Sequence, residues 1–264
     1  MFIWLLILMR FIVLIDKTHD KKEENFSLNK FTDISSNSLQ DRILNTYVNW
    51  RDHKNFYYSA NLKITYYNYL KSIENRDQSD AKELTSLYVD VINSDYSDLD
   101  KVYSSLNFIR KDRSLSRKKF AEVIVSMVQH IPYSYVVQKS CRSAALNDSS
   151  MYNSINNGTQ CEGGVFGGLY TPLEFINKKK GDCDSRTVLL WTILTHFGYD
   201  AVILNSDLYG HSIIGLNIPS SGRYKYYRGK RYYTWETTGK GFKVGMLPPS
   251  FSNIDHWYVA IHKS

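Results

Sequence analysis

The sequence contains little cysteine, with three residues in a chain of 264. This is too few for a disulfide scaffold, and no two of them lie two to four residues apart, as zinc ligands in pairs do. Cys141 and Cys161 lie in a polar stretch rich in Ser, Asn and Gly, whereas Cys183 lies in the sequence Gly-Asp-Cys-Asp. In an oxidising compartment the simplest pairing is Cys141 with Cys161, which leaves Cys183 as a free thiol.

Concentrated basic stretches are also lacking. The chain has 33 Lys and Arg against 26 Asp and Glu, for a net charge of +7, but they are spread along it with only short groups at 117–119 and 178–180. Nucleic-acid-binding proteins usually concentrate this charge in a patch or stripe, so we expect no nucleic-acid partner. With 43% apolar and 22% charged residues, the composition excludes wholesale disorder and a collagen-like chain.

The N-terminus lacks a complete export signal. Residues 2–15 are almost continuously apolar, apart from Arg10, but no basic segment precedes them and no Ala-x-Ala cleavage site follows. The run is shorter than the roughly 20 residues of a spanning helix. We predict that residues 1–16 direct the protein to a membrane and that residues 17–40 are a linker. The protein would be membrane-associated or exported, on the extracytoplasmic side; an N-terminal helix or strand docked on the domain is the alternative.

Hydrophobic spacing predicts a strand and helical region over residues 41–115. Alternating apolar residues indicate a strand over 58–66, and the periods that follow indicate helices capped by Ser79, Ser97 and Ser116. Pro132 requires the third of these helices to stop near Ile131.

The second half of the chain predicts a different arrangement. Residues 140–168, rich in Asn and Gly, are typical of a long loop or flap. Beyond them we expect a short helix from Thr171-Pro172, a helix apolar nearly all round and therefore buried, and three strands. The buried helix is expected over 185–197 and the three strands over 200–204, 211–218 and 231–236.

Cys183 lies at the amino end of the predicted buried helix. Unpaired N–H groups and the helix dipole at such an end lower the pKa of a thiol, and the N–H groups can also hold an oxyanion. Asp182 and Asp184 oppose a thiolate, so a positive partner is required. The alternative is an inert buried cysteine.

His211 and Glu236 are the candidate partners of this thiol. On the strand from His211, Ser212 and Ile214 face the core and His211 faces the other side. Antiparallel pairing of strands 211–218 and 231–236 would set His211 opposite Glu236, with their side chains on one face. The competing topology places residues 223–228 between the two strands and separates the pair. Without a catalytic role, His211 would be a surface histidine and Glu236 would cap the threonines that follow it.

These segments together resemble the transglutaminase-like superfamily of bacterial cysteine enzymes. The resemblance covers about residues 116–260, and the sequences that carry it are Gly181-Asp-Cys-Asp-Ser-Arg-Thr-Val-Leu-Leu190, Phe197-Gly-Tyr-Asp-Ala201, Gly210-His211 and Tyr233-Thr-Trp-Glu-Thr-Thr238. It implies an α+β, papain-like core over residues 116–264, with a nucleophile at a helix N-terminus packed on an antiparallel sheet.

The resemblance further implies a catalytic triad of Cys183, His211 and Glu236, with Glu where the family more often has Asp. The side-chain oxyanion donor stays open between Gln129, Tyr133 and Gln138. The function that follows is cysteine-dependent acyl transfer, foremost hydrolysis of a peptide or amide bond in a peptide or protein substrate, with no metal or cofactor. The alternatives are a protein-glutamine transglutaminase and an inactive binding or scaffold domain of the same fold.

Overall fold

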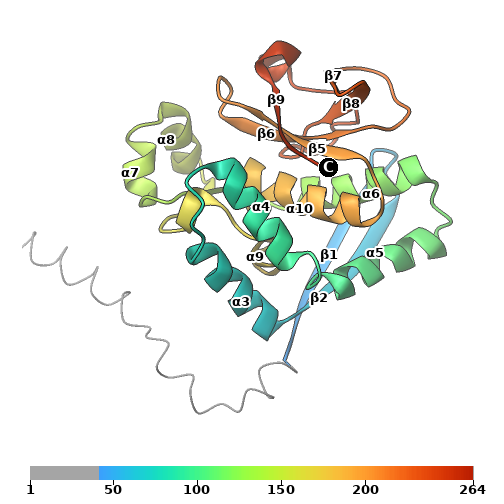
Figure 1. Cartoon of the computed structure of the whole chain (residues 1–264), viewed down its shortest axis with the longest axis horizontal. Helices are drawn as coiled ribbons and strands as arrows, with labels where there is room; N and C mark the ends of the chain where they lie inside the picture. The colour runs from blue at the N-terminus through green and yellow to red at the C-terminus, as the bar shows by residue number, and fades with distance from the viewer. Residues whose placement is uncertain (1–41, 264) are drawn as a thin grey trace, which may run out of the picture. The chain divides into compact units, whose positions relative to one another are not determined.

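An antiparallel five-stranded sheet dominates the C-terminal part of the chain (Figure 1). The structure is a computed structural model that describes residues 42–263. The strands lie in the order β7-β8-β6-β5-β9. Their bounds are β5 Ala201–Ser206, β6 His211–Leu216, β7 Tyr224–Tyr227, β8 Lys230–Trp235 and β9 Tyr258–His262. With the helices that precede this sheet, the chain has the α+β architecture that the sequence predicts.

Helices make up most of residues 42–200, the described part of the chain before the sheet. They are α3 Tyr66–Asp77, α4 Leu84–Asp95, α5 Asp100–Asp112, α6 Arg117–His130, α7 Cys141–Ala145, α8 Ser149–Asn156, α9 Pro172–Lys178 and α10 Cys183–His196. Two small sheets accompany them: the antiparallel hairpin of β1 (Ile43–Arg51) and β2 (Tyr57–Thr65), and the parallel pair of β3 (Ser134–Val136) and β4 (Gln160–Glu162).

Helix α10 is the central element of the core. It contacts β5 and β6 of the large sheet as well as α4, α6 and α9 (Figure 1). Val188, Leu189 and Leu190 are fully buried, which confirms the prediction of a helix covered on more than one face. The helix begins at Cys183 rather than Ser185, because the Asp182 side chain caps it by accepting the Ser185 N–H.

The face of the sheet that points away from α10 is covered as well. Val202, Leu204, Ile213 and Tyr232 form a second apolar cluster with Trp257, which the C-terminal segment supplies. Ile213 lies on the same side of β6 as His211 and is fully buried, so both faces of this strand are covered.

The β1–β2 hairpin packs one face on the helices. The burial of β2 alternates residue by residue, as its sequence predicts, and β2 contacts α5. Strand β1 and helix α3 were not predicted. In α3 the apolar residues Tyr66, Tyr69, Leu70 and Ile73 do recur at helical spacing, but they are half-buried, and the most deeply enclosed residues are Ser72 and Arg76.

Two of the three predicted helix caps are wrong. Helix α4 is preceded by Glu83 rather than capped by Ser79, and α5 by Leu99 rather than Ser97. Neither Glu83 nor Leu99 makes a side-chain capping bond. Ser116 does cap α6 as predicted, accepting the Lys119 N–H.

The predicted flap over residues 140–168 is also more ordered than expected, since it contains α7, α8 and β4 (Figure 1). Side chains of Ser140 and Asp148 cap the two helices. Cys141, at the start of α7, is joined to Cys161 in β4 by a disulfide, and Cys183 is a buried free thiol.

One continuous apolar core contains residues of both predicted regions, 41–115 and 116–264; Leu62 and Phe120 are examples. The boundary between these regions stays a prediction. The predictions for residues 1–16 and 17–40 lie outside the described residues. Across residues 42–263, no helix has the length and apolar character to cross a bilayer.

A buried polar cluster joins three helices at the edge of this core. Asp95, the last residue of α4, accepts hydrogen bonds from the Ser72 hydroxyl of α3 at 2.9 Å and the Leu173 N–H of α9 at 3.0 Å. Arg76 of α3 forms a buried ion pair with Glu174 of α9. Burial raises the pKa of Asp95 to about 6, although these hydrogen bonds oppose the increase.

The raised pKa of Asp95 makes stability dependent on pH. The folded protein holds this proton more tightly than the unfolded chain does. The protonated Asp95 therefore contributes fully to the free energy of unfolding below about pH 3.8, and this contribution is lost as pH rises through about 6. We expect Asp95→Asn to flatten the fall in unfolding free energy across this window, by up to about 3 kcal/mol. Urea unfolding of both proteins at several pH values measures it. An unchanged slope in the variant would contradict the assignment.

Candidate functional site

Cys183 is fixed at the amino end of α10. The Asp182 carboxylate accepts hydrogen bonds from the Ser185 N–H at 3.0 Å and from its hydroxyl at 2.7 Å, which closes the first turn of the helix. A side chain at Gly181 would bring a Cβ within 2.6 Å of the Phe175 ring, so only glycine fits where the chain enters the helix. The Cys183 side chain is 6% exposed.

The expected low pKa of this thiol is wrong. Burial raises the pKa of Cys183 well above its usual value, and the carboxylates of Asp184 and Asp182 raise it further. A hydrogen bond from the Ser212 N–H lowers it, but by less. The resting side chain is therefore a neutral thiol at pH 7, and the helix end alone does not ionise it.

His211 and Glu236 meet as the sequence predicts. The His211 Nε2 lies 2.9 Å from a Glu236 carboxylate oxygen, Oε2. The other oxygen, Oε1, accepts the backbone N–H groups of Thr237 at 2.8 Å and Thr238 at 2.7 Å, and the Thr238 hydroxyl at 2.7 Å. Glu236 is 1% exposed, and each of these groups can donate a hydrogen bond to its carboxylate.

This environment keeps Glu236 ionised. Burial alone would raise the pKa of the carboxyl, but hydrogen bonds and charge from His211, together with the hydrogen bonds of Thr238, bring it below its usual value. An ionised carboxylate can only accept hydrogen bonds. The His211 Nε2 is therefore the donor, which leaves Nδ1 as the ring nitrogen that can accept a proton.

The strand register that brings the pair together differs from the predicted one by two residues. Strands β6 and β8 are direct antiparallel neighbours, with Ile214 opposite Trp235 and Gly215 opposite Thr234. A shift of two residues keeps every side chain on its predicted face. Strand β8 ends at Trp235, and Glu236 reaches His211 from just beyond it. The competing topology is wrong, because residues 224–227 form an edge strand outside β8.

Side chains also join the start of β6 to the first turn of α10. The hydroxyls of Thr187 and Ser212 lie 2.7 Å apart. Ser212 follows His211 directly and Thr187 lies one turn after Cys183. The thiol and the imidazole thus come from two element ends that are held against each other.

Arg186 lies beneath these residues and is fully buried. Its guanidinium donates to the carbonyl groups of Gly181 at 3.1 Å, Val128 at 2.7 Å, Ile131 at 2.7 Å and Thr237 at 3.4 Å. Burial lowers the pKa of Arg186 to about 10, against the effect of the surrounding negative groups, so it stays charged at pH 7. Arg186 was not among the predicted site residues, although a lone arginine within an apolar helix is a usable signal in the sequence.

The three candidate oxyanion donors lie in different environments. The Gln129 amide donates to the carbonyl groups of Glu236 at 2.7 Å and Phe242 at 3.0 Å, so its N–H groups are engaged. Gln138 is exposed. Burial raises the pKa of Tyr133, and the negative forms of Cys183 and Asp182 nearby raise it further. Tyr133 also bridges Gly181 through the backbone. Of the three, Tyr133 is the one with both a position near the thiol and a proton it keeps.

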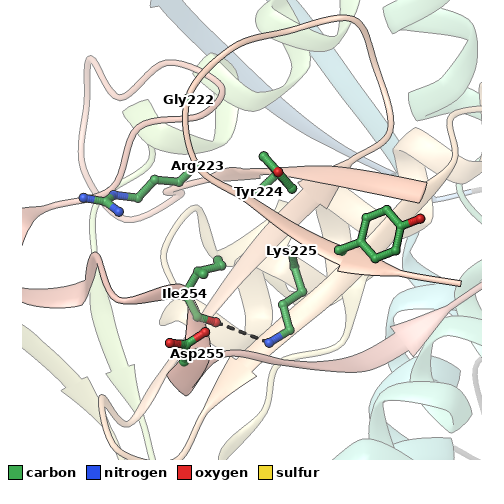
Figure 2. Close-up of a pocket in the computed structure, with 7 residues that line it drawn as sticks. Gly222, Arg223, Tyr224, Lys225, Ile254 and Asp255 are labelled. Carbon is green, nitrogen blue, oxygen red and sulfur yellow. Dashed lines mark hydrogen bonds between the residues drawn. The ribbon is translucent and has the colours of Figure 1, made fainter. Parts of the chain in front are cut away.

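A hollow of about 410 Å³ opens beside His211. Its lining residues are Glu83, Leu84, Thr85, Asp184, Asn205, Ser206, Asp207, Gly210, His211 and Tyr258. A second hollow lies between β7 and the segment before β9, where Lys225 donates to the Ile254 carbonyl beside Asp255 (Figure 2). That hollow contains none of Cys183, His211 and Glu236. Within the described part of the chain, no His, Cys, Asp and Glu side chains are grouped as a metal site would require.

No protein-family model matches the chain, and no curated protein matches it. Among solved structures, the chain is similar to one described as the crystal structure of a TGase, at 16% sequence identity and a TM-score of 0.33. The match covers 84% of this chain and 53% of that one, so the chain spans about half the length of that structure. A TM-score of this size does not by itself show a shared fold.

Arg186 should be essential for stability. We expect Arg186→Met to lower the unfolding free energy by at least about 3 kcal/mol, because the carbonyl groups of Gly181, Val128 and Ile131 lose a charged donor. Urea unfolding measures the loss. Arg113→Met, at an exposed arginine, is the control and should change stability by less than about 1 kcal/mol. Equal effects at both positions would contradict the role of Arg186.

Reactivity of Cys183 should rise with pH beyond the usual range of a thiol. Because the pKa is raised, the rate of iodoacetamide labelling should still increase above about pH 9, where an ordinary cysteine levels off. In the unreduced protein, mass spectrometry detects labelling at Cys183 alone, since Cys141 and Cys161 are joined in a disulfide. A plateau in the rate below pH 7 would show a thiolate instead.

Proposed function

We propose that the protein is a cysteine-dependent acyl-transfer enzyme that hydrolyses peptide or amide bonds. Cys183 is the nucleophile, His211 the general base and acid, and Glu236 the group that orients the imidazole. The hydrogen bond between His211 Nε2 and Glu236 carries this proposal, together with the 2.7 Å contact of the Ser212 and Thr187 hydroxyls, which joins the start of β6 to the first turn of α10. A carboxylate that fixes the tautomer and stabilises imidazolium is the third member of a triad.

The chemistry begins from the neutral thiol. His211 Nδ1 takes the thiol proton as Sγ attacks the carbonyl carbon, so no stable thiolate is needed before substrate binds. The imidazolium that forms is stabilised by the ionised Glu236. It returns the proton to the leaving amine as the carbon–nitrogen bond breaks. Water, deprotonated by the same imidazole, then hydrolyses the thioester and releases the acid and the thiol.

Two sets of donors are available for the oxyanion of the tetrahedral intermediates. The unpaired N–H groups at the amino end of α10 lie at Cys183 itself. The Tyr133 hydroxyl is the side-chain donor that we assign. Arg186 adds a fixed positive charge beneath the helix end and is the positive partner that Asp182 and Asp184 make necessary.

The same arrangement supports a transglutaminase-like, papain-like core for residues 116–264. In that core a helix carries the nucleophile and an antiparallel sheet carries the base. The Cys141–Cys161 disulfide supports an oxidising, extracytoplasmic location, since such bonds persist outside the cytosol.

The triad can be tested with a mixture of synthetic peptides, in which mass spectrometry detects hydrolysis. We expect Cys183→Ala to abolish hydrolysis and His211→Ala to slow it by roughly 10²- to 10⁴-fold. The thermal midpoint of the Cys183→Ala protein should hardly change, because a single sulfur atom is removed.

His256→Ala, at an exposed histidine that contacts Tyr209 rather than Glu236, is the matched control and should keep full activity. Hydrolysis that survives in Cys183→Ala would exclude the nucleophile. Absence of hydrolysis in the wild type, with peptides of every composition, would favour an inactive binding domain.

A further inference from the structure

The hollow beside His211 is acidic, in contrast to the whole chain. Glu83, Asp184 and Asp207 line it, and its lining includes no Lys or Arg. Burial raises the pKa of Asp184, whose carboxyl accepts the Tyr88 hydroxyl, so Glu83 and Asp207 supply most of the negative charge. The chain as a whole carries a net charge of +7. Glu83 lies just before α4 and makes no side-chain capping bond with it, so its carboxylate is not used by the helix. The local charge therefore favours a positive ligand.

A buried acceptor in the same hollow gives an independent indication. Asn205 is 7% exposed, and its Nδ2 donates to the Tyr88 hydroxyl at 3.3 Å. Its Oδ1 has no hydrogen-bond partner among the described residues. An unpaired buried acceptor costs about 1–3 kcal/mol, so this oxygen calls for a donor from outside the chain. Asn205 lines the hollow, but its Oδ1 is closed off from solvent, so a ligand donor pairs with this oxygen only after the amide turns toward the hollow.

The walls of the hollow suit a long side chain with a charged end. Leu84 and Tyr258 are 38% and 43% exposed, and both line the hollow. A methylene chain can pack on these groups while its cationic end faces the carboxylates, and a cation is also attracted to the face of a tyrosine ring. A metal ion has no apolar part that could pack against the Leu84 and Tyr258 side chains.

We propose that this hollow binds the cationic side chain of a Lys or Arg residue of the peptide substrate, close to the bond that Cys183 attacks. The proposal rests on the proposed function and specifies its substrate class. His211 is part of the hollow lining, so a side chain held there places its own backbone near the base. The cation itself takes part in no bond-breaking step.

Binding can be measured apart from chemistry in the full-length Cys183→Ala protein. The probes are Nα-acetyl-arginine methylamide and the matched citrulline compound, which has nearly the same shape without the charge. Calorimetry should show at least roughly tenfold tighter binding of the arginine compound, as expected for a charged hydrogen-bonded group. Equal affinities, or no binding of either compound, would overturn the proposal.

Substitutions in the Cys183→Ala background locate the binding. Glu83→Gln and Asp207→Asn should each weaken binding of the arginine compound by roughly two- to fivefold, as expected for exposed charge pairs. Binding of the citrulline compound should not change. Asp255→Asn removes the same charge at the other hollow (Figure 2) and should have no effect. An equal loss with Asp255→Asn would indicate nonspecific attraction and contradict the site.

Wild-type turnover separates this proposal from the proposed function. Peptides that differ only by Arg or citrulline at one position should be hydrolysed with different kcat/KM, and Glu83→Gln should reduce the difference. Charge-selective binding without any hydrolysis would keep the hollow and exclude the enzyme. Hydrolysis with the same kcat/KM for the Arg and citrulline peptides would keep the proposed enzyme function and exclude the hollow as a binding site for a cationic side chain. Incorporation of a labelled alkylamine, inhibited by the arginine compound, would make the hollow an amine-acceptor site and overturn its assignment to a substrate side chain.

Discussion

The buried guanidinium of Arg186 is the constraint on which the rest of the site depends. It collects carbonyl groups from the end of α6, from Gly181 before the thiol and from Thr237 after Glu236. The Val128 and Gly181 carbonyl groups also accept the backbone N–H groups of Ile131 and Ser134, so the guanidinium is a second, charged donor to them, and it holds three chain segments together at one point. The thiol and the carboxylate lie next to these carbonyl groups in sequence, and their positions follow from that meeting.

Local signals in the sequence were sufficient for much of this arrangement. Glycine and aspartate before an apolar helix predict that Cys183 lies at a helix start, and alternation predicts that His211 and Glu236 share a face. The capping prediction succeeds at Ser116 and fails at Ser79 and Ser97 because several polar residues compete near those helix starts. Capping chemistry is local, but the choice among neighbouring caps depends on tertiary packing.

Features that depend on distant residues were beyond the sequence. The register of β6 and β8 is set by where β8 ends and by the turns after it, so only the shared face was predictable. The pKa of Cys183 was misjudged because a helix end favours a thiolate only when solvent or cations help. Here burial and two adjacent aspartates dominate. Helix α3 was overlooked although its apolar residues recur at helical spacing. The polar cluster in which it buries Ser72 and Arg76 could not be predicted, because its other members come from α4 and α9.

The long sequence separations within the site have a consequence for how the protein is made. Arg186 precedes its acceptor at Thr237 by 51 residues, and Gln129 precedes its acceptor at Glu236 by 107. A chain emerging from the ribosome exposes its N-terminal part first, and folds it first where it can. The pairing of His211 with Glu236 must await nearly the last strand of the sheet. A nascent chain thus carries its thiol through the synthesis of the next 53 residues, up to Glu236, before the imidazole can be oriented.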